Sequence, residues 1–175
     1  ITPKKLFFEN DINACALAEK RFGRADGNFV WLTISTGNGG AVVANGELIR
    51  GASGCAGEIG HIKVERENAY PCGCGGSGCL EAHASGIAIA RRAVEAGLNP
   101  VTDARRCEEL AREGNATALA VYMQTGVYIG RALAVAANLV NPEYAFIGGG
   151  ASKALDLMLP AIQETLKKES VPQCA

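Results

Sequence analysis

Three cysteines within eight residues are the most specific feature of this sequence. Cys72, Cys74 and Cys79 lie in the run CGCGGSGC, whose glycines let the backbone turn all three sulfur atoms toward one point. Such soft, closely spaced ligands are typical of a metal site, and His61 is the natural fourth ligand. We expect these four residues to form a tetrahedral zinc site. Free or disulfide-paired thiols are the alternative, and they account less well for the glycine spacing.

A zinc site closed by four protein ligands leaves no position for a metal-bound water, so we expect the metal to order the loop without doing chemistry. If one ring nitrogen of His61 binds the metal, the other remains a hydrogen-bond donor with a fixed orientation. Glu58 and Glu81 lie on either side of the loop and are its expected polar neighbours. The alternative is that both glutamates are ordinary solvated surface charges.

Asn10 and Asp11 stand directly before an apolar helical pattern. A carboxylate in this position could accept the proton of an attacking hydroxyl group, which is the base role in phosphoryl transfer. Taken alone, the pair is more typical of a helix N-cap. Capping and catalysis are compatible roles.

Two glycine-rich turns predict contacts with a nucleotide. Thr36, Gly37 and Gly39 belong to the run STGNGG, whose backbone amides can approach phosphate oxygens closely. This run lacks the lysine of a Walker loop, and a tight turn between two strands is the alternative. Gly148 and Gly149 separate an apolar strand from a helix and could admit an adenine and ribose, with a plain strand-to-helix turn as the alternative.

The remaining pattern predicts an α/β chain with strands and loops in the first half and mainly helices in the second. Strands are expected at residues 6–8, 29–34, 41–44, 62–64 and 144–147, with Asn45-Gly46 as a hairpin turn. Helices are expected at residues 11–22, 86–96, 103–112, 116–139 and 152–168. The first helix is expected to carry Ala14, Leu17 and Ala18 on one face, with Cys15 and Cys55 packed inside, whereas His83 is expected to be structural or superficial.

Composition excludes several classes of protein. The 175 residues are 48% hydrophobic and 20% charged, which suits one globular domain and excludes a mostly disordered chain. A formal net charge of −1 does not favour a nucleic-acid partner. We see no uninterrupted apolar run near the roughly 20 residues of a membrane span and no secretory leader, so we expect a cytoplasmic protein without a membrane partner. The chain does not begin with Met, and we expect it to be a fragment.

Several motifs together resemble one family. GEIGH at 57–61, followed by CGCGGSGCLE at 72–81, resembles the zinc-binding signature of the ROK family, which comprises repressors, open reading frames and sugar kinases. Glu9-Asn10-Asp11 resembles its catalytic Asn-Asp motif, residues 36–40 its second phosphate loop, and residues 147–150 its adenosine-side loop. The resemblance runs from about residue 6 to 165. Ser35, Asn38 and Ala41 depart from the family pattern.

The resemblance implies a ribonuclease H-like lobe of the actin-like ATPase and sugar kinase superfamily. Residues 1–175 would form a single domain, the larger C-terminal lobe of a ROK kinase truncated at both ends and inactive alone. The implied full-length activity is phosphorylation of a hexose, either glucose or an N-acyl hexosamine, at its 6-hydroxyl, with ATP and Mg²⁺. Asp11 would be the general base, and the sugar would be bound by Asn10, Glu58, His61 and Glu81. A homodimer is also implied.

A second function is compatible with the same resemblance. The chain would then be the sugar-sensing effector domain of a ROK transcriptional repressor, with a DNA-binding winged helix ahead of Ile1. Repressors of the family often lose the Asn-Asp pair or the Thr-Gly loop. Because this chain keeps Asn10, Asp11, Thr36 and Gly37, the kinase is the preferred interpretation.

Overall fold

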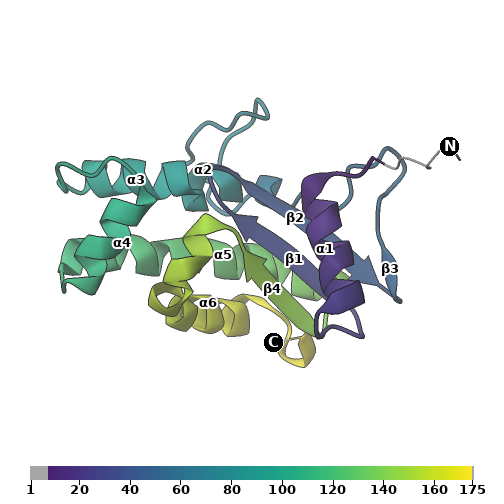
Figure 1. The fold of residues 1–175 in the computed structure, drawn as a ribbon. Coiled ribbons are helices and arrows are strands. Elements are labelled where there is room, and N and C mark those ends of the chain that lie inside the picture. Colours follow the sequence, from purple (N-terminus) through teal and green to yellow (C-terminus); the bar gives the residue numbers. More distant parts are fainter. Residues whose placement is uncertain (1–7, 175) are drawn as a thin grey trace, which may run out of the picture.

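A four-stranded sheet with helices on both faces forms the centre of the fold, which the computed structural model describes for residues 8–174 (Figure 1). The strands are β1 (Phe29–Ile34), β2 (Asn38–Ala44), β3 (Glu47–Leu48) and β4 (Tyr144–Gly148). Their order is β3-β2-β1-β4, with β1 antiparallel to β2 and parallel to β4. Because β1 and β4 are parallel neighbours, the turns that follow them lie at the same edge of the sheet.

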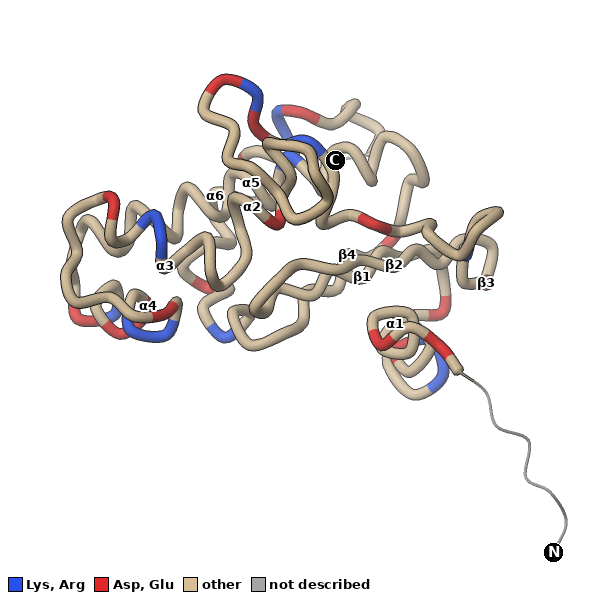
Figure 2. Tube along the Cα trace, turned by 90° about the horizontal axis from the view of Figure 1, so that it is seen from above, with Lys and Arg blue, Asp and Glu red and all other residues tan. Residues whose placement is uncertain are grey.

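Between residues 8 and 174, six α-helices accompany this sheet. They are α1 (Asp11–Phe22), α2 (Leu80–Ala84), α3 (Gly86–Glu95), α4 (Ala104–Arg112), α5 (Ala116–Val140) and α6 (Leu155–Glu169), with short 3-10 turns η1 (Ile59–His61), η2 (Gly150–Ala154) and η3 (Pro172–Cys174). Seen from above, α1 lies on one side of the sheet, and α2, α5 and α6 lie on the other (Figure 2). Helices α3 and α4 extend beyond the end of the strands (Figure 1). Acidic and basic residues are interspersed along the described chain (Figure 2).

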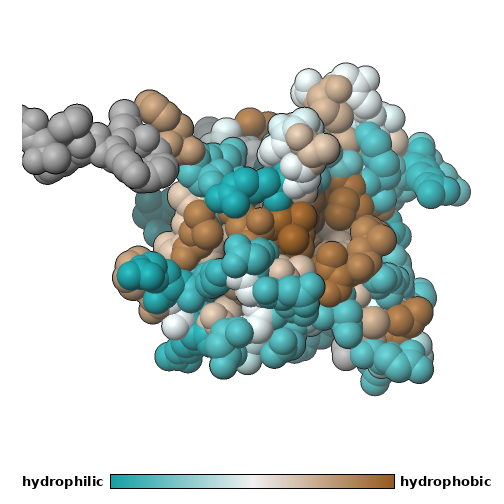
Figure 3. Space-filling view, turned by 90° about the vertical axis from the view of Figure 1, so that its right-hand side faces the viewer, coloured by the Kyte–Doolittle hydropathy of each residue, from teal (hydrophilic) through white to brown (hydrophobic). Residues whose placement is uncertain are grey.

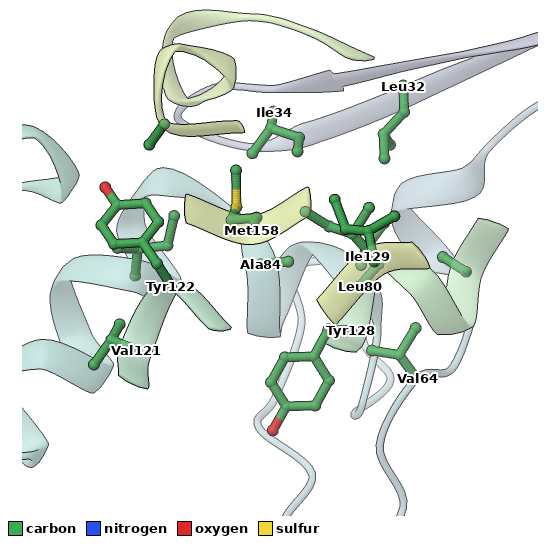
Figure 4. Packing of buried hydrophobic residues seen from close by; sticks show 14 of the residues in the cluster. Leu32, Ile34, Val64, Leu80, Ala84, Val121, Tyr122, Tyr128, Ile129 and Met158 are labelled. Carbon is green, nitrogen blue, oxygen red and sulfur yellow. The ribbon is translucent and has the colours of Figure 1, made fainter. Parts of the chain in front are cut away.

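Covered on both faces, β1 contributes to two hydrophobic cores, because successive side chains of a strand point to opposite faces. Leu32 and Ile34 belong to the larger core, where they lie above Ile129 of α5 and Met158 of α6 (Figure 4). Phe29 is fully buried in the smaller core on the α1 side. This double burial explains why the run at 29–34 is apolar without a polar alternation.

Close packing of α5 on α6 depends on two glycines. A Cβ atom at Gly126 would lie 2.5 Å from the carbonyl oxygen of Met158, and one at Gly130 would lie 2.6 Å from Cβ of Thr165. By length and composition α5 could also cross a membrane, contrary to the expectation that the chain holds no apolar run of this length. In the fold, 61% of its most apolar window is buried. Such burial is the usual property of a soluble protein's core helix.

Most predicted elements are confirmed. The strand at 29–34 has its predicted bounds, and the predicted helices agree to within a few residues. Asn45 and Gly46 have φ angles of 53° and 72°, as a two-residue hairpin turn requires. The last helix is preceded by the 3-10 turn η2, so its α-helical part begins at Leu155.

The predicted strand at 62–64 is wrong. Only Lys63 pairs there, in an isolated antiparallel bridge with Cys79, because the chain on either side is held in η1 and in the cysteine loop. The predicted strand at 6–8 lies outside the described residues except for Phe8, which is exposed and belongs to no strand.

The buried face of α1 also differs from the prediction. Two of the three residues expected there are exposed, namely Ala14 and Ala18. Asn13 and Ala16 are buried instead, and Cys15 faces outward. Small or apolar residues occupy every position from 14 to 18, so the sequence pattern does not mark one face of this helix. Cys55 is likewise exposed, because it lies in a glycine-rich loop that no other element covers closely.

Apolar side chains gather on the face of the molecule that carries β3, in a band bordered by hydrophilic residues (Figure 3). Large exposed apolar residues of the described chain include Ile49 directly after β3, Leu139 near the end of α5 and Tyr144 at the start of β4. Contiguous exposed apolar surface is typical of an interaction site.

Candidate functional site

The four predicted metal ligands lie together. One ligand atom from each of His61, Cys72, Cys74 and Cys79 lies within 4.8 Å of all the others. The Sγ atoms of Cys74 and Cys79 are 3.6 Å apart, and Cys72 Sγ is 3.6 Å from His61 Nδ1. Zn–S bonds of about 2.3 Å would place two thiolates of a tetrahedron about 3.8 Å apart. The cluster therefore has the donor types and the dimensions that zinc requires.

Three segments position these ligands. His61 is the last residue of η1, and Cys79 is the buried N-cap of α2. The loop between them folds back on itself through a hydrogen bond from the N–H of Cys72 to the carbonyl of Gly76, 2.8 Å long. The site is thus formed by a local loop that is fixed at both ends by helical turns.

The thiols of the metal-free cluster differ in acidity. Burial raises the pKa of Cys72 to about 11, whereas the backbone N–H of Gly76 lowers the pKa of Cys74. A hydrogen bond to Cys79 raises the pKa of the Lys63 ammonium. Because a bound metal ion takes cysteine as thiolate, metal binding must release thiol protons here.

Glu81 connects the metal cluster to the glycine loop after β1. Its Oε2 atom accepts a hydrogen bond of 3.1 Å from the backbone N–H of Asn38, and its Oε1 atom lies 3.8 Å from Cys72 Sγ. A Cβ atom at Gly37 would lie only 2.4 Å from Oε2, so glycine at that position leaves room for the carboxylate. The glutamate is therefore a bridging group and not a solvated surface charge.

His61 and Glu58 complete the polar surroundings of the cluster. The Nδ1 atom of His61 lies on the cluster side, so its Nε2 atom points away from the sulfur ligands. Glu58 is exposed at the start of η1, where its carbonyl accepts a hydrogen bond from the N–H of His61. Its carboxylate makes no capping hydrogen bond in this turn. Both side chains could therefore present polar atoms to a ligand.

Asn10 and Asp11 occupy the N-terminus of α1. The Oδ1 atom of Asn10 accepts hydrogen bonds from the N–H groups of Ile12 and Asn13, at 2.9 and 3.2 Å, so this residue is an N-cap. Asp11 is the first residue of the helix and is exposed. Its carboxylate thus stands on a fixed backbone with access to a ligand.

Glu9 is a structural residue of this segment whose role the sequence did not reveal. Its carboxylate accepts hydrogen bonds from the backbone N–H of Asn10, the amide of Asn13 and the guanidinium of Arg50, the last at 2.6 Å. The pKa of Glu9 is lowered, first by the hydrogen bond from Arg50. The only feature of the sequence that pointed to Glu9 is its position directly before Asn10 and Asp11.

Strand β2 brings α1 and η1 to the same part of the sheet. A Cβ atom at Gly39 would lie 2.7 Å from the Ile12 side chain, and one at Gly40 would lie 2.5 Å from the carbonyl oxygen of Gly57. Neighbouring strand residues face opposite sides, so the two glycines admit α1 on one side and the turn before His61 on the other.

The larger of two neighbouring cavities has a volume of about 740 Å³, within the usual range of ligand sites. Thr36, after β1, and Gly150, after β4, both line it, so the two predicted nucleotide loops meet at one cavity. Helices α3 and α4 form its opposite wall. The α4 residues and Lys153 carried no sequence signal, because only the folded chain brings them to the loops.

Gly148 and Gly149 lie beside this cavity, against β1. A Cβ atom at Gly148 would lie 2.7 Å from the ring of Trp31, and one at Gly149 would lie 2.3 Å from the carbonyl oxygen of Ile34. Gly149 also has a φ angle of 91°, which favours glycine. These two residues keep the turn after β4 close to the end of β1.

Arg112 fixes α4 over the larger cavity. Its guanidinium donates two hydrogen bonds to Asp156 of α6, of 2.8 and 2.9 Å, one to Glu108 and one to the carbonyl of Lys153. The hydrogen bonds to Asp156 and Glu108 raise the pKa of Arg112, and the guanidinium lowers that of Asp156. The wall of the cavity is therefore tied to the turn that carries Gly150.

A smaller cavity of about 360 Å³ lies on the metal side, lined among others by Thr36, Gly37, Cys72 and Glu81. Thr36 and Ile87 line both cavities. A ligand in the larger cavity could therefore reach one in the smaller cavity beside Thr36.

His83 lies outside the metal cluster, as expected for a structural residue. It is fully buried between the rings of Tyr70 and Tyr128, and its Nε2 atom accepts a hydrogen bond from the N–H of Tyr70. Burial lowers its pKa, which favours the neutral imidazole needed as an acceptor. His83 thus fastens the start of the cysteine loop to α5.

Comparisons with known proteins identify the relatives of this fold. The model of the ROK family matches residues 2–173. A glucokinase from Halalkalibacterium halodurans is 39% identical over 189 residues, which cover 99% of this chain and 57% of that protein. The DNA-binding transcriptional dual regulator NagC of Escherichia coli K12 is 32% identical over 176 residues, which cover 94% of this chain and 43% of the regulator.

A solved structure agrees with these similarities. The crystal structure of a ROK family glucokinase from Streptomyces griseus in complex with glucose and AMPPNP superposes with a TM-score of 0.83 at 32% identity. The superposition covers 93% of this chain and 58% of that one. The fold is therefore the mixed α/β fold of ROK sugar kinases, and the chain spans somewhat more than half the length of the kinases it matches.

Proposed function

Because the chain belongs to the ROK family, we propose that the full-length protein carrying it phosphorylates a hexose at its 6-hydroxyl group with ATP. The observation that carries this proposal is the position of Thr36, which lines both the larger cavity and the metal-side cavity. A phosphoryl group held at this residue stands between a nucleotide on one side and a sugar on the other. Similarity to the glucokinase of H. halodurans supports a sugar substrate.

The sugar is bound on the metal side. Asn10, Glu58, His61 and Glu81 supply hydrogen-bonding groups for its hydroxyls, and charged acceptors form strong hydrogen bonds with hydroxyl donors. Asp11 acts as the general base that takes the proton of the attacking 6-hydroxyl. Its exposed position at the first residue of α1 leaves the carboxylate accessible to a substrate.

The nucleotide occupies the larger cavity. Thr36 lines this cavity, Gly37 lines the smaller cavity beside it and Gly39 follows in β2, so the phosphates would approach the turn at Thr36 and Gly37. Gly148 and Gly149 hold the β4 turn that carries Gly150 into the cavity wall. Mg²⁺ accompanies ATP and supplies neutralisation of the phosphate charge. Glucose or an N-acyl hexosamine is the substrate class we propose.

Zinc is the metal we propose for the cluster of His61, Cys72, Cys74 and Cys79. When bound, it supplies structural cross-linking of the loop and no open coordination position. His61 then presents its Nε2 atom to the sugar in one orientation, and Glu81 is held between the loop and Asn38.

This chain is proposed to be the larger C-terminal lobe of the kinase, a single domain that is inactive alone. The full-length protein is proposed to be cytoplasmic and homodimeric, and the apolar face beside β3 offers surface of the kind that dimers bury (Figure 3). Neither a nucleic acid nor a membrane is proposed as a partner of this segment.

Replacement of the proposed base tests the function. In the full-length protein, Asp11→Asn should lower kcat for hexose phosphorylation by about 100- to 10,000-fold, the usual contribution of a general base. Sugar binding, measured by calorimetry, should change little. Asp26→Asn, at an exposed aspartate outside the site, is the matched control. Near-normal turnover of Asp11→Asn would contradict the proposal.

A sugar-sensing effector domain of a ROK repressor is the second candidate, and the identity to NagC is the observation that favours it. The same metal cluster would serve it. Sugar binding without phosphoryl transfer from ATP, together with sugar-dependent DNA binding by the full-length protein, would establish the repressor in place of the kinase.

A further inference from the structure

A lysine lies against the metal cluster and is not one of its ligands. The Nζ atom of Lys63 donates a hydrogen bond of 2.9 Å to the Sγ atom of Cys79. Cys79 is fully buried, so this sulfur atom is shielded from water. The contact places a positive charge at hydrogen-bond distance from one of the four proposed metal ligands.

The backbone holds Lys63 in this position. Lys63 and Cys79 face each other in an isolated antiparallel bridge, in which opposed side chains lie on the same side. Hydrogen bonds of 2.9 Å flank the bridge, one from the N–H of Leu80 to the carbonyl of Ile62 and one from the N–H of Val64 to that of Gly78. The segments 62–64 and 78–80 are thus paired at Lys63 and Cys79, and this pairing fixes where the lysine side chain starts.

The cysteine loop leaves space for the ammonium. A Cβ atom at Gly76 would lie 2.7 Å from Nζ of Lys63 and 3.7 Å from Sγ of Cys74. With glycine there, the ammonium lies between the loop backbone and the sulfur atoms. Within the described part of the chain, Lys63 forms no ion pair with a carboxylate. The residue is exposed, and its Nζ atom contacts the cysteine cluster from the solvent side.

The charge of the filled site explains what this lysine does. Three thiolates and one neutral imidazole around Zn²⁺ carry a net charge of −1, and residues that hydrogen-bond to ligands tune metal affinity. We propose that Lys63 is the counter-charge of the metal centre: its ammonium, hydrogen-bonded to the sulfur of Cys79, offsets the net charge of the filled site and slows loss of the metal. The inference rests on the proposed zinc site but not on kinase activity.

Zinc affinity measured by chelator competition tests this role in the full-length protein. Lys63→Met should lower the affinity by about 10- to 100-fold, the usual cost of losing a partner of a metal ligand. Lys63→Arg, which retains charge and donor, should stay within a few-fold of the wild type. The matched control is Lys168→Met in the last turn of α6, which should not alter zinc binding. Wild-type affinity in Lys63→Met would overturn the proposal.

A second variant separates charge from hydrogen bonding. Lys63→Gln keeps a donor without a charge, and it should lose zinc nearly as readily as Lys63→Met. Cobalt(II) bound in place of zinc gives a thiolate-to-metal absorption band, which should shift in Lys63→Met and Lys63→Gln but not in Lys63→Arg. This band also reports that the four ligands still assemble, and an unshifted band in all variants would refute the contact. Less than one zinc per wild-type chain would instead refute the metal site itself.

Discussion

The metal side and the nucleotide side of this molecule are built in different ways. On the metal side, four ligands come from a segment of nineteen residues, 61–79, and their spacing already fixes which atoms can meet. On the nucleotide side, the cavity is lined by residues from Ser35 to Lys153. Its wall depends on the packing of α4 against α3 and α5 and on the contact of Arg112 with Asp156. A local loop can be recognised from its sequence, whereas a cavity between distant elements can be recognised only after folding.

Metal removal should give the largest effect on stability, and it should affect ligand binding on the metal side more than on the nucleotide side. The metal would join four side chains of one loop, and structural zinc contributes directly to folding. In the full-length protein, a strong chelator or Cys79→Ala should lower Tm by at least about 10 °C. Sugar binding should be lost while nucleotide binding to the larger cavity is weakened less. Equal loss of both ligands would break the distinction between the two sides.

A methyl group at Gly37 should have the next largest effect. Its Cβ would lie 2.4 Å from Oε2 of Glu81, and the flexible end of the glutamate would move away. Loss of one hydrogen bond to a charged group corresponds to about a 10- to 100-fold decrease in kcat/KM for the sugar. Gly37→Ala should show this decrease in steady-state kinetics, with a normal zinc content.

Two further variants sharpen this prediction. Glu81→Asp draws the carboxylate back, so its effect and that of Gly37→Ala should be less than additive in the double variant. In Gly150→Ala the added Cβ meets no protein atom within 4 Å, so a rise in KM for ATP above about threefold would report contact of this residue with the nucleotide itself. Full additivity of the first pair would show that the two residues act separately.

The smallest effect is expected at the edge of the nucleotide cavity. Arg112→Gln removes the hydrogen bonds that hold α4 to Asp156 and to the carbonyl of Lys153. KM for ATP should rise by about two- to fivefold with little change in KM for the sugar, because exposed ion pairs contribute modestly. Arg106→Gln, whose partners Glu109 and Glu113 lie on or next to its own helix, is the control. An unchanged KM for ATP would show that α4 is held by packing alone.

Sequence alone predicted those features that depend on local pattern. The cysteine spacing, the Asn45-Gly46 turn and the central apolar strand are encoded by neighbouring residues, and all are confirmed as structure. The buried face of α1 was predicted wrongly because small or apolar residues occupy every position from 14 to 18 and so point to all sides of the helix. The segment at 62–64 has β-branched residues but finds a partner only at Lys63, since the chain beside it is held in the cysteine loop.

The parts of the site that sequence could not place depend on contacts between distant residues. Glu81 accepts a hydrogen bond from the N–H of Asn38, a residue 43 positions away in the sequence. Arg112 and Lys153 meet at the larger cavity because the folded chain brings α4 next to η2. No spacing rule within one element reports such contacts.

The contact of Glu9 with Arg50 has a consequence for how this site tolerates change. One carboxylate holds the first turn of α1 and also the start of the loop that leads to Glu58. The ion pair therefore links the two segments. An insertion between residues 50 and 58 would alter the distance between Glu58 and Asp11. Length variation in this lobe should accumulate elsewhere, for example between α3 and α4, where the chain can grow without moving either residue.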